Sequence, residues 1–164
     1  MQQFNDIYFA GGCFWGVEAY FKLIPGVKQV SVGYANGFTQ NPSYEDVCYG
    51  NSGHAEAVKV TYNPQELSLS QLVSAFFEII DPLSLNRQGN DRGSQYRTGI
   101  YYTNQEDCAV VAKVMAEEQK KYNQPLAVEL LPLEHYYLAE EYHQDYLTKN
   151  PNGYCHINLN KFKY

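Results

Sequence analysis

The sequence has little that suits a nucleic-acid or membrane partner. Its 164 residues carry 12 Lys and Arg against 18 Asp and Glu, giving a net charge of -6, and a negative protein is repelled by anionic polymers and surfaces. No run approaches the roughly 18 apolar residues of a membrane span, and the first residues lack the charged and apolar regions of a signal peptide. We therefore expect a cytoplasmic monomer that binds neither nucleic acid nor membranes.

Repeats, low-complexity tracts and linkers are also missing. A chain of this length is most simply one domain with a substantial core. We therefore predict a single catalytic domain over residues 1–164, ending in a mobile tail at 149–164.

Cysteine is scarce, with four residues at Cys13, Cys48, Cys108 and Cys155. Three pairings are possible, but the chain is large for a disulfide scaffold and shows no export signal. In a reducing compartment, widely spaced cysteines are more often buried, catalytic or redox-active.

One of these thiols lies in a short glycine-rich stretch, Gly11–Gly16. An apolar strand is expected just before it, at Ile7–Ala10, and helical spacing from Val17 to Ile24 follows it. Cys13 therefore lies at a helix start, where the helix dipole favours the reactive thiolate. A buried structural cysteine is the alternative, but three glycines within six residues leave the sulfur open to a ligand.

A carboxyl group on a strand offers a possible acid. Residues 56–62 alternate, and Glu56 lies on the same face as Val58, Val60 and Tyr62. If that face is the core, Glu56 is desolvated and protonated near neutrality, as a general acid must be. If the strand enters the core only after its first residue, Glu56 is solvated, and parity does not decide between the two.

The remaining pattern predicts an α+β fold with a ferredoxin-like split βαβ core, in which helices pack on a mixed sheet. Capping boxes are expected at Ser68–Gln71 and Thr103–Glu106. Further elements are predicted from periodicity and turn residues: strands at 27–34, 99–102 and 126–131, helices at 69–80, 103–115 and 138–147, and long functional loops at 35–54 and 83–97.

Other chemically capable residues have simpler interpretations. We expect Cys48 to be structural, Cys108 to be core, and His54, which alternates away from Glu56, to be a hydrogen-bonded structural histidine. Glu140 and His143 have the i, i+3 spacing of half a di-iron site, but the other half is missing, and no zinc spacing is present. We therefore expect no metal.

Four motifs in chain order resemble those of peptide methionine sulfoxide reductase, A type, and they span almost the whole chain: Gly12–Trp15, Tyr44–Cys48 leading into Gly53–Glu56, Asp91–Arg97, and Gly153–Cys155. Four motifs at these separations make chance similarity very unlikely. Reduction of methionine sulfoxide by this class of enzyme restores an oxidised side chain.

The resemblance implies a role for each motif. Cys13 would attack the sulfoxide sulfur, and Phe14 and Trp15 would wall an apolar slot for the substrate methyl group. The remaining implied roles concern the sulfoxide oxygen: Glu56 would protonate it, Tyr44 and Tyr96 would hold it by hydrogen bonds, and Asp91 would help to position the substrate or the tyrosines.

The resemblance also implies how the enzyme is recycled. Cys13 would be left as a sulfenic acid that condenses with Cys155 to a disulfide. Thioredoxin, or dithiothreitol in the test tube, would reduce that disulfide, so no bound cofactor is expected. The last nine residues hold no further cysteine, which predicts direct reduction of this one disulfide.

Two alternatives belong to other classes. The helix-start cysteine also suits another thiol enzyme such as a peroxidase. The aromatic-rich loops suit a non-enzymatic module that grips a peptide or sugar, although two thiols such as Cys13 and Cys155 have no purpose there.

Overall fold

The computed structural model describes residues 3–37, 39–40, 42–49, 52–88 and 91–150. Residues 151–164 of the predicted tail, including Cys155, therefore lie outside the described residues, whereas Lys149 is the last residue of a short helix. The elements follow in chain order: β1 (Asn5–Gly11), α1 (Phe14–Lys22), β2 (Val27–Ala35), α2 (Tyr44–Tyr49), β3 (Ala55–Tyr62), α3 (Leu69–Phe77), β4 (Arg87–Gln88), β5 (Asp91–Arg92), η1 (Ser94–Tyr96), β6 (Thr98–Tyr102), α4 (Gln105–Gln119), β7 (Glu129–Pro132), β8 (Tyr136–Leu138), η2 (Glu141–His143) and α5 (Tyr146–Lys149).

Six of the strands form one sheet in the order β7-β6-β1-β3-β2-β8. β1 lies antiparallel between β3 and β6, whereas β6 and β7 run parallel. This arrangement confirms the predicted α+β fold with a mixed sheet. β7 and β8 extend it by one strand at each edge, and the ferredoxin-like description of the core stays a prediction.

One face of the sheet carries the large apolar side chains and is covered by helices. Phe9 of β1 stacks on Phe21 of α1, with ring centroids 4.7 Å apart, and contacts Phe76 of α3 at the same separation. Val58 and Ile100 lie in the same buried cluster. Burial of these rings contributes on the order of 2 kcal/mol each, so this face is the main core.

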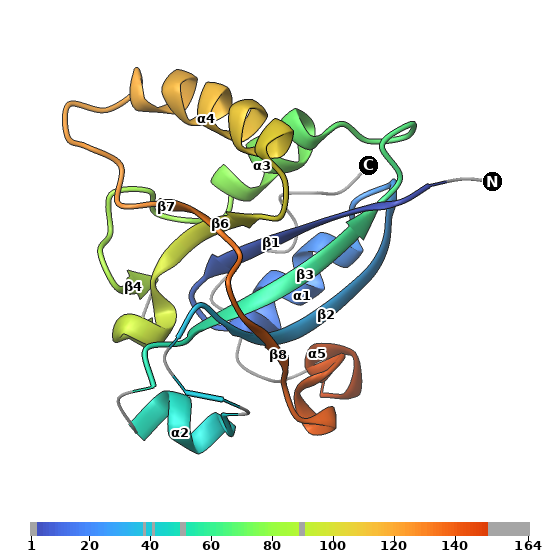
Figure 1. Ribbon diagram of the computed structural model, residues 1–164, viewed down its shortest axis with the longest axis vertical. Coiled ribbons are helices and arrows are strands. Elements are labelled where there is room, and N and C mark those ends of the chain that lie inside the picture. The colour runs from blue at the N-terminus through green and yellow to red at the C-terminus, as the bar shows by residue number, and fades with distance from the viewer. Residues whose placement is uncertain (1–2, 38, 41, 50–51, 89–90, 151–164) are drawn as a thin grey trace.

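The opposite face carries small residues, and a stretch of chain crosses it. We call residues 133–138, the last three of which form β8, the strap. It crosses the sheet on the side away from α1 (Figure 1), and Leu133 and Tyr136 pack on a buried cluster rich in alanine. A Cβ at Gly33 would lie 2.5 Å from the Tyr136 ring, so glycine lets the strap approach closely.

Most of the predicted regular elements are confirmed. The first four long strands and the first two long helices lie within a few residues of their predicted bounds. The Ser68–Gln71 capping box is present with both hydrogen bonds. The N-cap of the third helix lies one residue later than predicted: Asn104 rather than Thr103 caps it and accepts the Asp107 N–H at 2.9 Å.

Three predictions about irregular segments are wrong. The loop at 35–54 contains α2, and the loop at 83–97 contains β4, β5 and η1. These elements have two to six residues, too short to show a clear period. The helix predicted at 138–147 is instead the end of β8, then η2 and the start of α5, because Asp145 adopts a left-handed conformation with φ 56°.

The segment that follows the strap is anchored to α1 by a buried carboxylate. Glu18 is 2 % exposed, and its Oε2 accepts the Asp145 N–H at 3.0 Å. Burial raises the pKa of Glu18 to about 7, although Lys22, the Tyr146 amide and Lys149 favour its charged form. The anchor therefore titrates near neutral pH.

This titration predicts a pH-dependent stability that Glu18→Gln removes. Because the folded pKa is raised above the ordinary value of 4.5, the folded state holds the proton more tightly than the unfolded state. The free energy of unfolding of the wild type should then fall by up to about 3 kcal/mol as pH rises from about 4.5 to about 7. Urea denaturation across this range measures the difference from Glu18→Gln, with exposed Glu106→Gln as the control. A difference that does not change with pH would contradict the role of Glu18.

Candidate functional site

Cys13 lies between the end of β1 and the start of α1, as predicted. It is the N-cap residue of α1, with φ -62° and ψ 125°, and Gly12 before it has φ 85°, a conformation that favours glycine. Cys13 is 6 % exposed and therefore buried, whereas the neighbouring glycines predicted an open sulfur. The first turn of α1 holds no acidic residue, so the positive end of the helix dipole favours a thiolate there.

Glu56 lies next to this helix start. Its side chain is 1 % exposed, and Oε1 accepts the backbone N–H of Phe14 at 3.2 Å. Of the two possibilities that parity left open, the buried one is therefore right and the solvated one is wrong. Burial disfavours the ionised form of the carboxyl group, and the bond to Phe14 brings it beside the residue that follows the thiol.

An aromatic wall faces the same helix start. The His143 ring lies 4.5 Å from the Tyr44 ring and 5.2 Å from the Phe14 ring, measured between centroids. Trp15 stacks on Tyr146 at 3.7 Å with an interplanar angle of 11°. Phe14 is buried and Trp15 half-buried, so the segment that carries His143 and Tyr146 closes this side of the site together with α2.

His143 is held in a defined protonation state. Its Nδ1 accepts the Trp15 Nε1–H at 3.0 Å, so in the neutral ring the proton is on Nε2. Burial lowers the pKa of His143 despite the charge of Glu140, which keeps the ring neutral near pH 7. Nε2 is buried without a hydrogen-bond partner among the residues that the structure describes, and it offers a donor to a ligand.

Sequence reasoning missed His143 as a site residue: it weighed only the i, i+3 spacing to Glu140 as half of a di-iron site and rejected it because the other half is missing. The available signal was the concentration of aromatic and ionisable residues at 140–146. Its partner Trp15 is 128 positions away, and no periodicity links segments so far apart.

Tyr96 and Asp91 come from the segment before β6. η1, which ends at Tyr96, packs against β3, the strand that carries Glu56. Asp91 pairs with Gln88 in the small β4–β5 sheet, and its side chain lies outside the described residues. The structure thus brings Tyr96 to the strand of the candidate acid and leaves the role of Asp91 as a prediction.

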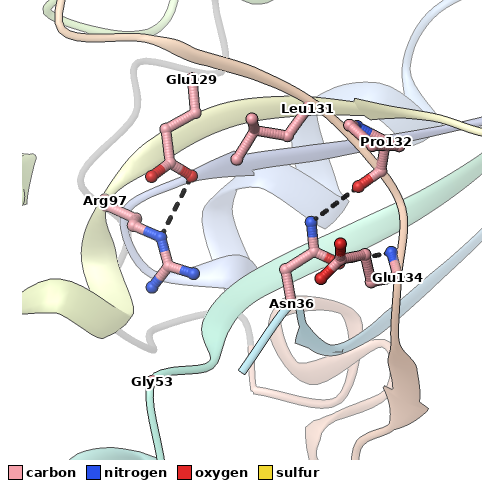
Figure 2. A pocket seen from close by; sticks show the side chains of 7 residues that line it. All are labelled: Asn36, Gly53, Arg97, Glu129, Leu131, Pro132 and Glu134. Atoms are coloured by element: carbon pink, nitrogen blue, oxygen red, sulfur yellow. Dashed lines mark hydrogen bonds and ion pairs between the residues drawn. The ribbon is translucent and has the colours of Figure 1, made fainter. Parts of the chain in front are cut away.

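A cavity of about 390 Å³ lies at the same end of the sheet, and Figure 2 shows its lining: Asn36, Gly53, Arg97, Glu129, Leu131, Pro132 and Glu134. Arg97 Nε donates to Glu129 Oε2 at 3.2 Å, and the Tyr101 hydroxyl donates to the same oxygen at 2.9 Å. Tyr101 belongs to the cluster under the strap, whereas Glu56 shares the helix-covered face with Val58. The cavity therefore opens on the other face of the sheet. The ion pair between Arg97 and Glu129 fixes the position of Arg97, which follows Tyr96 in the chain.

The other candidate residues have structural surroundings. His54 is buried, its Nδ1 accepts the Gly37 N–H at 3.0 Å, and its Nε2 lies 2.8 Å from the Thr39 carbonyl oxygen, so it is structural, as predicted. Cys108 is half-buried rather than a core residue, and Val111 is the one residue of α4 that is buried. The side chain of Cys48 lies outside the described residues.

The described residues contain neither a metal-binding cluster nor a helix that could span a membrane. No three His, Cys, Asp or Glu side chains there are grouped so that they could hold a metal ion. Within the same part of the chain, no helix combines the length and apolar character needed to cross a membrane.

Comparison with known proteins gives consistent matches over nearly the whole chain. The family model described as "Peptide methionine sulfoxide reductase" matches residues 5–164. A Mycoplasma genitalium protein named "Peptide methionine sulfoxide reductase MsrA" is 59 % identical over 153 residues, which are 93 % of this chain and 98 % of that protein.

Solved structures agree. Mxr1 from Saccharomyces cerevisiae in its reduced form is 40 % identical, with a TM-score of 0.88 over 93 % of this chain and 89 % of that one. The same yeast protein in complex with Trx2 matches at 29 % identity and a TM-score of 0.63, covering 88 % and 85 % of the two chains. With a thiol at a helix start, a buried carboxyl group beside it and these matches, the chain belongs to the peptide methionine sulfoxide reductase family of enzymes.

Proposed function

We propose that the chain reduces the S epimer of methionine sulfoxide, free or in peptides and proteins, with Cys13 as nucleophile. The observation that carries this proposal is the placement of the Cys13 thiol at the start of α1, with Glu56 bonded to the next amide at 3.2 Å. A thiolate and a protonated acid on one small site are what sulfoxide reduction needs, because oxygen leaves sulfur only when it is protonated.

The chemistry proceeds as a two-electron exchange. The Cys13 thiolate attacks the sulfoxide sulfur while Glu56 delivers a proton to the oxygen, and Tyr44 and Tyr96 donate hydrogen bonds to that oxygen as its charge grows. This attack forms a bond between the two sulfur atoms, and the oxygen leaves as water after it takes a second proton. A water molecule then attacks the Cys13 sulfur and loses a proton, and the sulfur–sulfur bond breaks with its electron pair on methionine. Methionine sulfur is thereby reduced by two electrons, and Cys13 is oxidised by two electrons to a sulfenic acid.

The substrate side chain is proposed to lie along the aromatic wall. Phe14 and Trp15 supply the apolar surface for the terminal methyl group, and His143 Nε2–H offers a donor to a polar group of the substrate. Asp91 is proposed to help position the substrate or the tyrosines.

Recycling is proposed to use Cys155 and an external reductant rather than a bound cofactor. The Cys155 thiol attacks the sulfenic acid, a Cys13–Cys155 disulfide forms and water leaves. Two thiols of a thioredoxin then reduce the disulfide by exchange. The complex of the yeast relative with Trx2 supports a thioredoxin in this role.

Two cysteine substitutions separate attack from recycling. Cys13→Ser should abolish reduction of the S epimer, and Cys155→Ser should release about one methionine per enzyme and then stop when thioredoxin is the reductant. Methionine release from resolved epimers of a sulfoxide peptide measures both. Cys108→Ser is the matched control and should turn over like the wild type. Sustained thioredoxin-driven turnover by Cys13→Ser would refute the proposal.

The acid is tested by Glu56→Gln. The amide keeps the size of the side chain and can still accept the Phe14 N–H, but it has no proton to give, so the single-turnover rate should fall about 10²- to 10⁴-fold. Rapid-quench measurement of methionine over a pH series gives this rate. The wild-type rate should decrease toward high pH, and the residual rate of the variant should lack that dependence. Exposed Glu66→Gln serves as the control, and an unchanged rate for Glu56→Gln would remove Glu56 from the mechanism.

A further inference from the structure

A carboxylate between the strap and η2 holds two parts of the site together. Glu140 directly precedes η2, and its Oε1 accepts the Tyr34 hydroxyl at 2.7 Å. Its Oε2 accepts the backbone N–H of Tyr44 at 3.0 Å. One side chain therefore links β2, the first residue of α2 and the segment that carries His143.

Both bonds are charge-assisted. Burial raises the pKa of Glu140, but hydrogen bonds from the Tyr44 amide and the Tyr34 hydroxyl outweigh burial and hold this pKa below its ordinary value. Burial, with Glu140 as acceptor, raises the pKa of Tyr34, so the phenol stays a donor. Charged hydrogen bonds are roughly twice as strong as neutral ones, and Glu140 is thus a firm anchor.

The partners of Glu140 lie at the candidate reaction centre. Tyr34 is fully buried, pairs with Glu56 across β2 and β3, and has its ring 5.8 Å from that of Phe14. The Tyr44 ring lies 6.5 Å from the same Phe14 ring. Tyr44 begins the six-residue helix α2, which is too short to hold its own position.

We infer that Glu140 is a positioning residue for the reduction and acts through Tyr44. This inference rests on the proposed function, in which the Tyr44 phenol holds the sulfoxide oxygen. Misplacing such a group by about 1 Å can cost on the order of 100-fold in rate. Because the phenol acts most strongly on the charge that develops in the transition state, the loss appears in kcat rather than in KM.

A double-mutant cycle tests this inference on the full-length protein. Glu140→Ala removes both acceptors and should lower kcat for the S-epimer peptide about tenfold, with KM changed less than about twofold. In a Tyr44→Phe background the same substitution should change kcat by less than about twofold, because the phenol through which it acts is gone. Glu140→Gln, which keeps the side-chain volume, gives the same comparison if the alanine variant does not fold.

The matched control is Glu141→Gln. This neighbour is exposed and pairs only loosely with Lys149, at 3.7 Å, so removing its charge should leave kcat at the wild-type value. Wild-type kcat in both Glu140 variants overturns the inference. The inference is also overturned if Glu140→Ala lowers kcat by the same factor in the Tyr44→Phe background as in the wild type. Such an additive loss would indicate a structural role alone. A wild-type enzyme that does not reduce the S epimer would instead refute the proposed function.

Discussion

The hydrogen bond from the Phe14 amide to Glu56 is the contact on which the site depends. It joins the β1–α1 turn, which carries the thiol, to the start of β3, which carries the acid. The bond requires the register in which Phe9 faces Val58. A slip of one residue would turn Glu56 to the strap side of the sheet, so packing of the apolar face also fixes the chemistry.

The other half of the site is built by side chains rather than by regular structure. The segment at 139–150 holds only a 3₁₀ turn and one short helix, yet it reaches Trp15 through His143 and Tyr146 and reaches α1 through Glu18. Glu140 ties it to Tyr34 and Tyr44. Because several of these contacts involve a carboxylate or an imidazole, the geometry of the wall is sensitive to charge.

Sequence reasoning worked where a physical signal is local. Strand alternation, the glycines before Cys13 and the Ser68–Gln71 box each act within a few residues, and those elements are confirmed. It failed for α2, whose six residues are too few to show a clear period, and for the helix expected at 138–147, which Asp145 interrupts with a left-handed conformation. The burial of Glu56 could be decided only once the sheet was known. The hydrogen bond between Trp15 and His143 joins residues 128 positions apart, and no local pattern in the sequence predicts such a contact.

The anchored wall also bears on how a resolving thiol reaches Cys13. Cys155 follows Tyr146 by nine positions and Asn150 by five, and Tyr146 stacks on Trp15, two residues from the nucleophile. Five residues span at most about 17 Å, so the sequence limits the distance from Asn150 to Cys155 to about that length. A short tether of this kind makes loop closure entropically cheap. In the proposed mechanism, the contact that holds Tyr146 against Trp15 also fixes where this tether starts, which links substrate recognition to capture of the sulfenic acid.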